Sequence, residues 1–188
     1  MATVGRTEEI GSTPAASVMQ GMASGASATN PKRPLFKAQV QNRQRQFRVY
    51  SKSVASFCAA ILKALDQPAW MLSIAFVDAC EMRVMNCRYL GRNFATDVLS
   101  FPYRGVIMEG MPFLGEIVIA PEVAQRHALR YRTSHEREIR RLLVHGILHL
   151  LGYDHEKDKG EMNRLQDKLL QRQLFLNSPP IGDLKVDR

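Results

Sequence analysis

Three histidines near residue 150 have the spacing of a metal-binding site. His145 and His149 are four residues apart, so on a helix their imidazoles project from one face, one turn apart. Gly152 follows and lets the chain turn back, so that His155 can return as a third ligand. Three neutral imidazoles around Zn²⁺ leave a fourth position open for water, which is typical of catalytic zinc sites. We therefore predict that His145, His149 and His155 bind one zinc ion.

The residue after the first of these histidines distinguishes the site from that of the zinc proteases. Metzincins carry H-E-x-x-H-x-x-G-x-x-H, in which the glutamate is the general base. Position 146 is a glycine here, and glycine cannot accept a proton. The spacing therefore favours metal-dependent hydrolysis, whereas the missing carboxylate argues against the protease mechanism. His127 and His135 lie outside the spacing, and we assign them surface or capping roles.

One long helix is expected to carry the first two ligands. The sequence T-S-H-E at 133–136 fits a capping box, with Thr133 as N-cap and Glu136 at the third helical position. An apolar-periodic run over Ile139–Leu151 follows, and Gly152 ends the helix as a C-cap residue.

The rest of the chain shows a mixture of strand and helix patterns. Apolar runs and period-two alternation predict strands at Phe47–Tyr50, Met71–Val77, Thr96–Phe101 and Leu114–Ile119. Apolar residues at helical spacing predict a helix that is capped by Ser51 or Ser53 and reaches Leu65. A second helix is predicted from Asp78 or Ala79 to Leu90. Two more are predicted at Pro121–Arg130 and over Met162–Leu174.

These elements predict one α+β domain over residues 36–178. We expect a small mixed sheet of about four strands packed with about five helices. Residues 1–35 are rich in Gly, Ala, Ser and Thr, which predicts a disordered leader or a fusion remnant. The S-P-P sequence at 178–180 predicts that a C-terminal tail occupies 179–188.

The net charge of +8 is concentrated near the N-terminus. Residues 10–65 contain eight Lys and Arg and no Asp or Glu, and the remainder is nearly balanced. A basic excess fits an anionic partner such as nucleic acid, although its position says little about the histidine site. Closer to that site is a run of arginines that could contact RNA backbone or form a solvated helix face, namely Arg126, Arg130, Arg132, Arg137, Arg140 and Arg141.

Cysteine usage and the N-terminal sequence bear on location. Three cysteines without a C-x-x-C pair predict buried thiols in a reducing compartment. Residues 1–30 lack the apolar core of a secretory signal, and Glu8 and Glu9 argue against a transit peptide. Apolar stretches are about half the roughly 18 residues that a membrane-spanning helix needs. We expect a soluble cytoplasmic protein with no membrane partner, an organellar location being left open.

The histidine string resembles the hallmark of the YbeY family, single-domain metal-dependent endoribonucleases of ribosomal RNA maturation. That hallmark, H-G-x-L-H-L-x-G-Y-D-H, stands without a mismatch at 145–155. The sequences M-N-C-R-Y at 85–89 and T-D-V-L-S-F-P at 96–102 are similar to the family's L-N-x-x-Y-R and T-D-V-L-S-F-P elements. L-G-E-I at 114–117 is similar to its L-G-D-I strand, with Glu for Asp. The resemblance covers residues 70–170.

The resemblance implies a single-strand-specific zinc endoribonuclease in ribosomal RNA processing, small-subunit rRNA 3′ end maturation and ribosome quality control. It implies ribosomal RNA, ribosomal subunits, small-subunit ribosomal proteins and a ribosome-associated GTPase as partners. One Zn²⁺ would lower the pKa of a bound water towards about 7, and no side-chain base is assigned. The nucleophile could be this water or the 2′-hydroxyl of the RNA.

Further polar residues have two interpretations each. The family has an Arg after the Tyr of L-N-x-x-Y-R, to hold substrate phosphate, where this chain has Leu90. Arg88 and Arg92 flank Leu90 and could bind the substrate phosphate instead, or they are solvated surface residues. Asp154 could orient an imidazole or cap a helix end. Two more carboxylates could line the cleft or form local ion pairs, namely Asp97 and Glu116.

Three functions are therefore weighed. The first is a zinc endoribonuclease that acts on ribosomal RNA. The second is a zinc hydrolase of another substrate, such as a peptide, which Gly146 disfavours. The third is a non-catalytic zinc-containing ribosome-assembly factor, which Leu90 keeps open.

Overall fold

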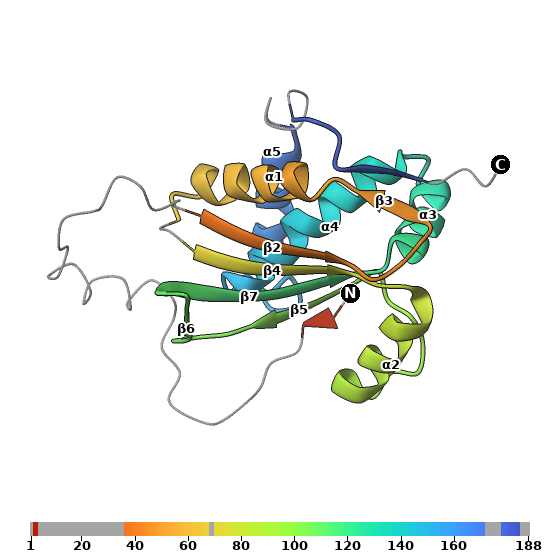
Figure 1. Ribbon diagram of the computed structural model, residues 1–188, viewed down its shortest axis with the longest axis horizontal. Helices are drawn as coiled ribbons and strands as arrows, with labels where there is room; N and C mark the ends of the chain where they lie inside the picture. Colours follow the sequence, from red (N-terminus) through yellow and green to blue (C-terminus); the bar gives the residue numbers. More distant parts are fainter. Residues whose placement is uncertain (1, 4–35, 68–69, 172–177, 185–188) are drawn as a thin grey trace, which may run out of the picture.

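A computed structural model describes residues 2–3, 36–67, 70–171 and 178–184 (Figure 1). The helices are α1 (Ser51–Ala64), α2 (Ala79–Leu90), α3 (Pro121–Arg130), α4 (His135–Leu150) and α5 (Glu161–Gln171). The strands are β1 (Ala2–Thr3), β2 (Phe36–Asn42), β3 (Phe47–Val49), β4 (Trp70–Phe76), β5 (Val98–Pro102), β6 (Ile107–Met108), β7 (Met111–Ile119) and β8 (Gly182–Leu184). No helix in these ranges is long and apolar enough to cross a membrane.

The main sheet is mixed, as the sequence predicts. Its strand order is β1-β5-β7-β4-β2, with β6 paired to β7. Strands β2, β4 and β7 are parallel, whereas β5 lies beside β7 and runs antiparallel to it. Strand β1 pairs with β5 at Leu99 and Ser100. Strands β3 and β8 form a separate antiparallel pair.

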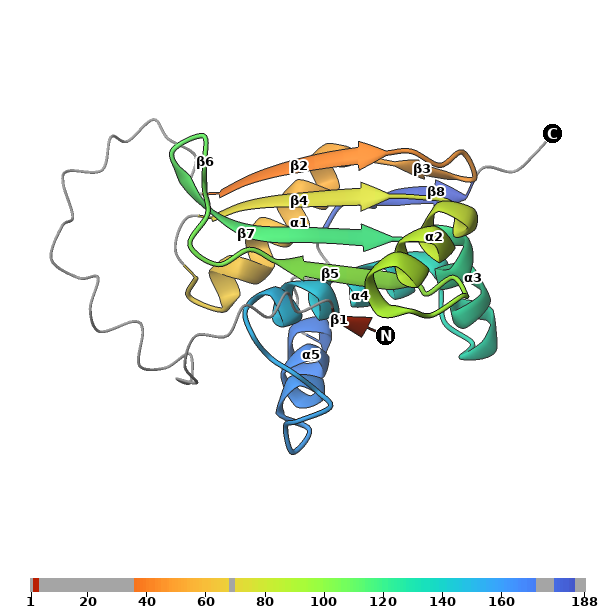
Figure 2. The same ribbon diagram turned by 90° about the horizontal axis from the view of Figure 1, so that it is seen from below.

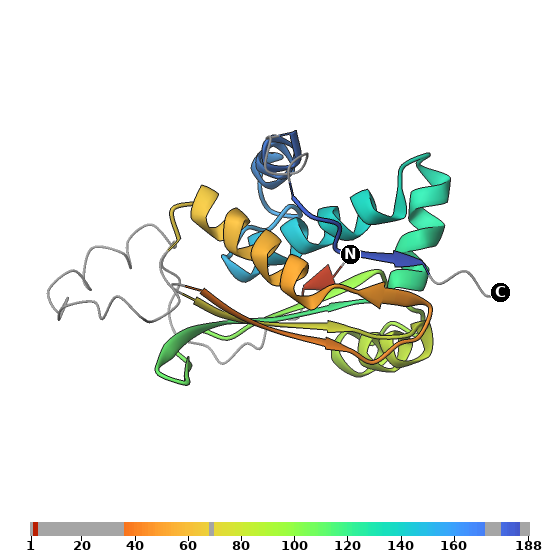
Figure 3. The ribbon, with the colours of Figure 1, turned by 45° about the horizontal axis from the view of Figure 1, so that its top comes forward.

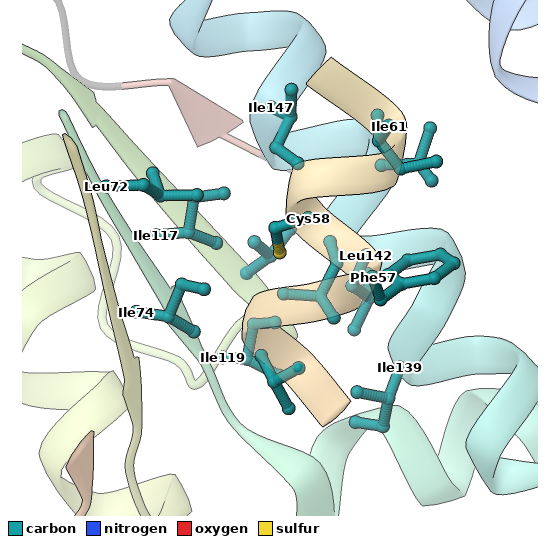
Figure 4. Packing of buried hydrophobic residues seen from close by; sticks show 14 of the residues in the cluster. Phe57, Cys58, Ile61, Leu72, Ile74, Ile117, Ile119, Ile139, Leu142 and Ile147 are labelled. Carbon is teal, nitrogen blue, oxygen red and sulfur yellow. The ribbon is translucent and has the colours of Figure 1, made fainter. Parts of the chain in front are cut away.

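Helices cover the two faces of the sheet unequally. Helices α1 and α4 lie on one face and α2 on the other, where α2 covers only one end of the strands (Figure 3). The main core lies between the sheet and the first pair of helices, where Ile74 and Ile117 pack with Phe57, Leu142 and Ile147 (Figure 4). Side chains alternate between the faces of a strand, so the next residues along the strands form the smaller cluster under α2.

The ends of α4 differ from the predicted capping residues. Ser134, and not Thr133, is the N-cap, because its Oγ accepts a hydrogen bond from the N–H of Arg137 at 3.1 Å. Thr133 donates its own N–H to the carbonyl of Ala128 and so belongs to the turn that follows α3. The helix ends with Leu151 as C-cap, and Gly152 follows at φ +97°, in the left-handed region that favours glycine.

The other predicted elements are found with shifts at their ends. The bounds of α3 match the prediction, and α2 ends before Gly91 as expected. Neither predicted serine caps α1, since its N-cap is Tyr50 and Ser51 is its first residue. The predicted continuation of α5 to Leu174 lies outside the described residues.

Four strands lie where the sequence predicted none, namely β1, β2, β6 and β8. Phe36–Asn42 forms β2, in which Phe36, Ala38 and Val40 alternate with polar residues and pack on the main core. The segment predicted as a tail contains β8, and Ile181 before it is fully buried. Of the predicted leader, Ala2–Thr3 forms β1, and residues 1 and 4–35 lie outside the described residues.

Candidate metal centre

The three predicted ligands lie together at the C-terminal end of α4. The helix brings His145 and His149 to the same face, and the loop after Gly152 returns His155 beside them. One ring nitrogen from each imidazole lies within 4.8 Å of those of the other two. The ring centroids of His145 and His149 are 4.5 Å apart, and that of His155 is 5.3 and 5.1 Å from them. The three histidines could therefore hold one metal ion.

Hydrogen bonds fix which nitrogen of each helical histidine is free. Nδ1 of His149 lies 2.9 Å from the backbone carbonyl of Tyr153, and Nδ1 of His145 lies 3.0 Å from Oε1 of Gln166 on α5. Both partners are acceptors, so each Nδ1 carries the proton and each Nε2 presents a lone pair. Gln166 was missed by the sequence analysis, because its distance of 21 residues from His145 follows no helical or motif spacing.

The environment keeps these imidazoles neutral. Burial, followed by the nearby His149, lowers the pKa of His145 to about 3. Burial, followed by His155, also lowers the pKa of His149. Neutral imidazole is the form that binds a metal.

The arrangement of the nitrogens fits a cation. Nε2 of His145 and Nε2 of His149 face each other at 3.0 Å, so two lone pairs are directed into the same space. Nδ1 of His155 is buried and has no hydrogen-bond partner within the described residues. A cation between these atoms would turn repulsion into coordination, and a set made only of imidazole nitrogens suits a divalent transition metal.

A cleft of about 540 Å³ opens beside His149. The end of β5, the loop after α4 and the start of α5 form its walls, and its lining residues are Pro102, Arg104, His149, Gly152, Tyr153, Asp154, Lys157, Asp158 and Glu161. Nη2 of Arg104 lies 3.7 Å from the position that a Cβ on Gly152 would take. Arg104 was not among the predicted site residues, although it lies only two residues after the T-D-V-L-S-F-P block.

The acidic residues of the cleft stabilise its loop. Asp154 pairs with Lys157 at 3.1 Å and accepts a hydrogen bond from the N–H of Glu156, and the Lys157 contact lowers its pKa. These contacts correspond to the capping interpretation of Asp154, and none of the hydrogen bonds in the described residues joins it to a histidine. Asp158 accepts from the N–H groups of Gly160 and Met162 at the start of α5.

The two strand carboxylates do not line this cleft. Asp97 precedes β5 and is 1% exposed; its Oδ2 lies 3.0 Å from Nδ1 of His127 and 3.6 Å from Arg141. The alternative of a local ion pair therefore describes Asp97. Glu116 lies on β7 directly opposite Phe101, on the face covered in part by α2. Burial raises the pKa of Glu116, and Arg43 opposes this shift.

The arginine run does not form one RNA-facing stripe. Arg140 is 2% exposed, pairs with Glu136 and donates to the carbonyl of Pro179 at 2.7 Å. Arg141 is held by Glu138, and Arg126 pairs with Glu122 on α3. Arg140 and Arg141 are thus engaged by burial and local carboxylates and Arg126 by an ion pair, which corrects the interpretation of the whole run as one backbone-binding surface. The others are exposed, namely Arg130, Arg132 and Arg137.

Arg88 and Arg92 are exposed at and just beyond the end of α2. Helix α2 lies on the face of the sheet opposite α4 (Figure 3). Leu90, which replaces the family arginine, is partly buried and packs against the small apolar cluster under α2. The phosphate-binding role of Arg88 and Arg92 stays a prediction.

The two remaining histidines have more specific contacts than predicted. His127 pairs with Asp97. His135 is the first residue of α4; its Nε2 lies 2.9 Å from the carbonyl of Pro121, and its ring packs edge-on against Phe47 at 4.9 Å. Burial lowers the pKa of His135.

A mixed sheet covered on one face by α1 and α4, with three histidines of α4 and the following loop placed so that they could hold one metal ion, defines an α+β protein with a candidate metal centre. The family model described as Endoribonuclease YbeY matches residues 39–173. The chain is 41% identical over 149 residues to "Endoribonuclease YbeY" of Thermodesulfovibrio yellowstonii, covering 70% of this chain and 94% of that one. It is 43% identical over 106 residues to that of Helicobacter pylori strain P12, covering 55% and 72%.

A solved structure has a similar fold. The solution structure of TM1509 from Thermotoga maritima is similar to this fold with a TM-score of 0.51 and 26% identity, covering 71% of this chain and 87% of that one. The chain belongs to the Endoribonuclease YbeY family.

Proposed function

We propose that this protein is a zinc-dependent endoribonuclease that cleaves single-stranded regions of ribosomal RNA. The observation that carries this proposal is the pair of unprotonated Nε2 atoms of His145 and His149, 3.0 Å apart, beside a cleft that holds Arg104. The family's name supplies the reaction class, since its members are called endoribonucleases. Processing of the small-subunit rRNA 3′ end and ribosome quality control are part of this proposal.

The ligand set favours zinc. His145, His149 and His155 supply three nitrogens and no thiolate, as in catalytic zinc sites with an open fourth position. When bound there, the metal would polarise a phosphate oxygen and make an attacking hydroxyl group more acidic. Gln166 and the carbonyl of Tyr153 would keep the imidazoles in the metal-binding tautomer throughout the reaction.

Other residues would hold the RNA. Arg104 and Lys157 provide cations in a cleft that also contains three carboxylates. Arg104 has the planar guanidinium that binds two phosphate oxygens at once, and none of the described carboxylates pairs with it. We therefore assign Arg104 the phosphate contact that Leu90 cannot make.

A peptide hydrolase is the weaker alternative because of the packing at position 146. A Cβ on Gly146 would lie 2.9 Å from two side-chain atoms of Ile117 on β7. The sheet therefore occupies the direction in which a glutamate would have to extend, and no carboxylate from this position could reach the metal centre. The alternative of a non-catalytic assembly factor predicts zinc binding and ribosome binding without RNA cleavage.

The decisive experiment incubates zinc-loaded protein with small-subunit ribosomal RNA and, separately, with a peptide library. We expect RNA fragments and no peptide products. A chelated sample and His149→Ala should both be inactive, because each removes the metal. Cleavage that persists in both controls would contradict the metal mechanism, whereas ribosome co-sedimentation without cleavage would favour the assembly factor.

Arg104→Ala tests the substrate contact separately from the metal. We expect its zinc content to equal that of the wild type while the KM for RNA rises about tenfold or more. Arg126→Ala is the matched control, since Arg126 is exposed on α3 and pairs with Glu122. Equal KM values for the two variants would remove Arg104 from the proposed site.

A further inference from the structure

The face of the sheet away from α4 contains an uncovered row of side chains. In the strand register, Phe101 lies opposite Glu116, Glu116 beside Ser73, and Ser73 beside Gln39. Side chains of directly paired residues point to the same face, so these four, which we call the open row, lie next to one another. All four are partly or fully exposed. Figure 2 shows this face of the sheet, with α2 over one end only.

Apolar clusters bound the open row on both sides. The neighbouring row contains Leu99, Val118 and Ala75, which are buried under α2. On the opposite side, Met71 and Phe113 are buried with Met111 beside the β6 turn. The open row therefore lies between two apolar clusters, with Gln39 donating a hydrogen bond to Glu109 beside β6 at 3.5 Å, and it offers polar groups at Glu116 and Ser73.

Two exposed tyrosines stand where the open row meets β5. Tyr89 at the end of α2 is 45% exposed and packs edge-on against Phe101 at 5.0 Å. Tyr103 is 44% exposed and packs against Phe113 at 5.3 Å. Each ring therefore packs against the fold on one side and still presents ring surface to a further stacking partner.

An exposed arginine lies beside the first tyrosine, and another follows the second tyrosine in the sequence. The guanidinium of Arg88 lies 5.7 Å from the centre of the Tyr89 ring, and Arg104 directly follows Tyr103. A ring beside a guanidinium matches a nucleotide, whose base stacks on the ring while its phosphate binds the cation. This charge and shape fit single-stranded nucleic acid.

The open row is continuous with the metal cleft across a single strand. Pro102 and Arg104 line the cleft, whereas Phe101 and Tyr103 alternate with them along the chain and contact the other face. Within the described residues, β1 pairs with β5 only at Leu99 and Ser100. An RNA chain could thus cross this edge from the cleft to the open row.

We propose that the open row, with Tyr89, Tyr103 and Arg88, binds about two unpaired bases of RNA next to the phosphate held by Arg104 in the metal cleft. This inference rests on the proposed function for the identity of the substrate. Bases stack on the two tyrosines, and Glu116 and Ser73 accept hydrogen bonds from the base edges.

The test measures binding without cleavage. His149→Ala protein, which lacks a metal ligand, is titrated into a fluorescent single-stranded oligoribonucleotide, and anisotropy gives the Kd. Adding Tyr89→Leu or Tyr103→Leu should weaken binding about tenfold each, and Tyr89→Phe, which keeps the ring, should restore it. An oligonucleotide that lacks bases should bind weakly and equally to all of these proteins.

Tyr131→Leu is the matched control, because Tyr131 is 68% exposed and has an adjoining arginine but lies at the end of α3. Unchanged binding by both Leu variants, equal loss in Tyr131→Leu, or no binding of the oligonucleotide at all would overturn the proposal. Its failure is distinct from that of the proposed function, since wild-type protein could still cleave ribosomal RNA in each of these cases. Conversely, if binding depended on the tyrosine rings but the wild-type protein cleaved no RNA, the RNA-binding role of the open row would stand and the proposed nuclease activity would be refuted.

Discussion

Gln166 of α5 accepts a hydrogen bond from His145 of α4 at 3.0 Å. Gln166 is 7% exposed, so water cannot readily replace it. This contact joins the last described helix to the metal centre and determines which nitrogen of His145 is free.

Gln166→Leu should therefore weaken zinc binding by about 10-fold to 100-fold. Gln166→Glu should bind zinc at least as well as the wild type, because a carboxylate also accepts the Nδ1 proton. Competition with a chromophoric chelator gives both affinities. If Leu and Glu at this position have the same effect, the hydrogen bond does not orient the ligand.

Arg141 neutralises two buried carboxylates, and its removal should be costly. Its guanidinium lies 2.6 Å from Glu138, which is 4% exposed, and 3.6 Å from the nearly inaccessible Asp97. Arg141→Met leaves both charges without this partner, so we expect the free energy of unfolding to fall by about 3 kcal/mol. Urea denaturation measures it, and Arg126→Met, which breaks an exposed pair, should cost at most about 1 kcal/mol.

His135 should make stability fall in mild acid. Because burial lowers its pKa in the folded state, the unfolded chain takes up a proton first as the pH drops below the ordinary value of 6.5. The contribution is therefore present at neutral pH and is lost progressively below 6.5. Urea titrations at pH 7.5 and 5.5 should show a smaller pH dependence for His135→Gln, which keeps a donor for the Pro121 carbonyl, than for the wild type. If the free energy of unfolding changed equally with pH in both proteins, His135 would contribute nothing to the pH dependence.

Gly146→Ala should destabilise the protein although alanine is the better helix former. The new Cβ would meet three atoms of Ile117 at 2.9 to 3.1 Å, and overpacking of this kind costs roughly 1–3 kcal/mol. Ile117→Ala removes all three atoms, so the double variant should lose less stability than the two single losses added together. If the stability losses of the two single variants simply added up in thermal or urea unfolding, the new Cβ would not clash with Ile117.

Local signals explain why much of the fold could be predicted from the sequence. Pro121 fixes the start of α3, and Gly91, at φ +69°, fixes the end of α2. The closeness of His145 and His149 follows from a helical spacing that is visible in the sequence. Strand β2 was missed, although Phe36, Ala38 and Val40 alternate with polar residues, because it lies in the basic region next to the predicted leader.

What could not be predicted depends on contacts between distant segments. Gln166 reaches His145 only because α5 packs on α4. Arg140 is buried because Phe57 and the carbonyl of Pro179 surround its guanidinium, and neither is near it in sequence. The composition of the arginine run alone could not separate this buried side chain from the exposed ones.

The contact between Arg140 and Pro179 also has a consequence for biosynthesis. A ribosome makes the sheet, α1 and α4 before it makes residues 179–184, which supply β8, the buried Ile181 and the carbonyl that Arg140 requires. Nascent chains should therefore pass through a loosened state until residues 179–184 emerge. A stop codon after Ser178 should reproduce that state as a lower Tm and faster proteolysis, and an unchanged Tm would show that the fold is already closed without its last strand.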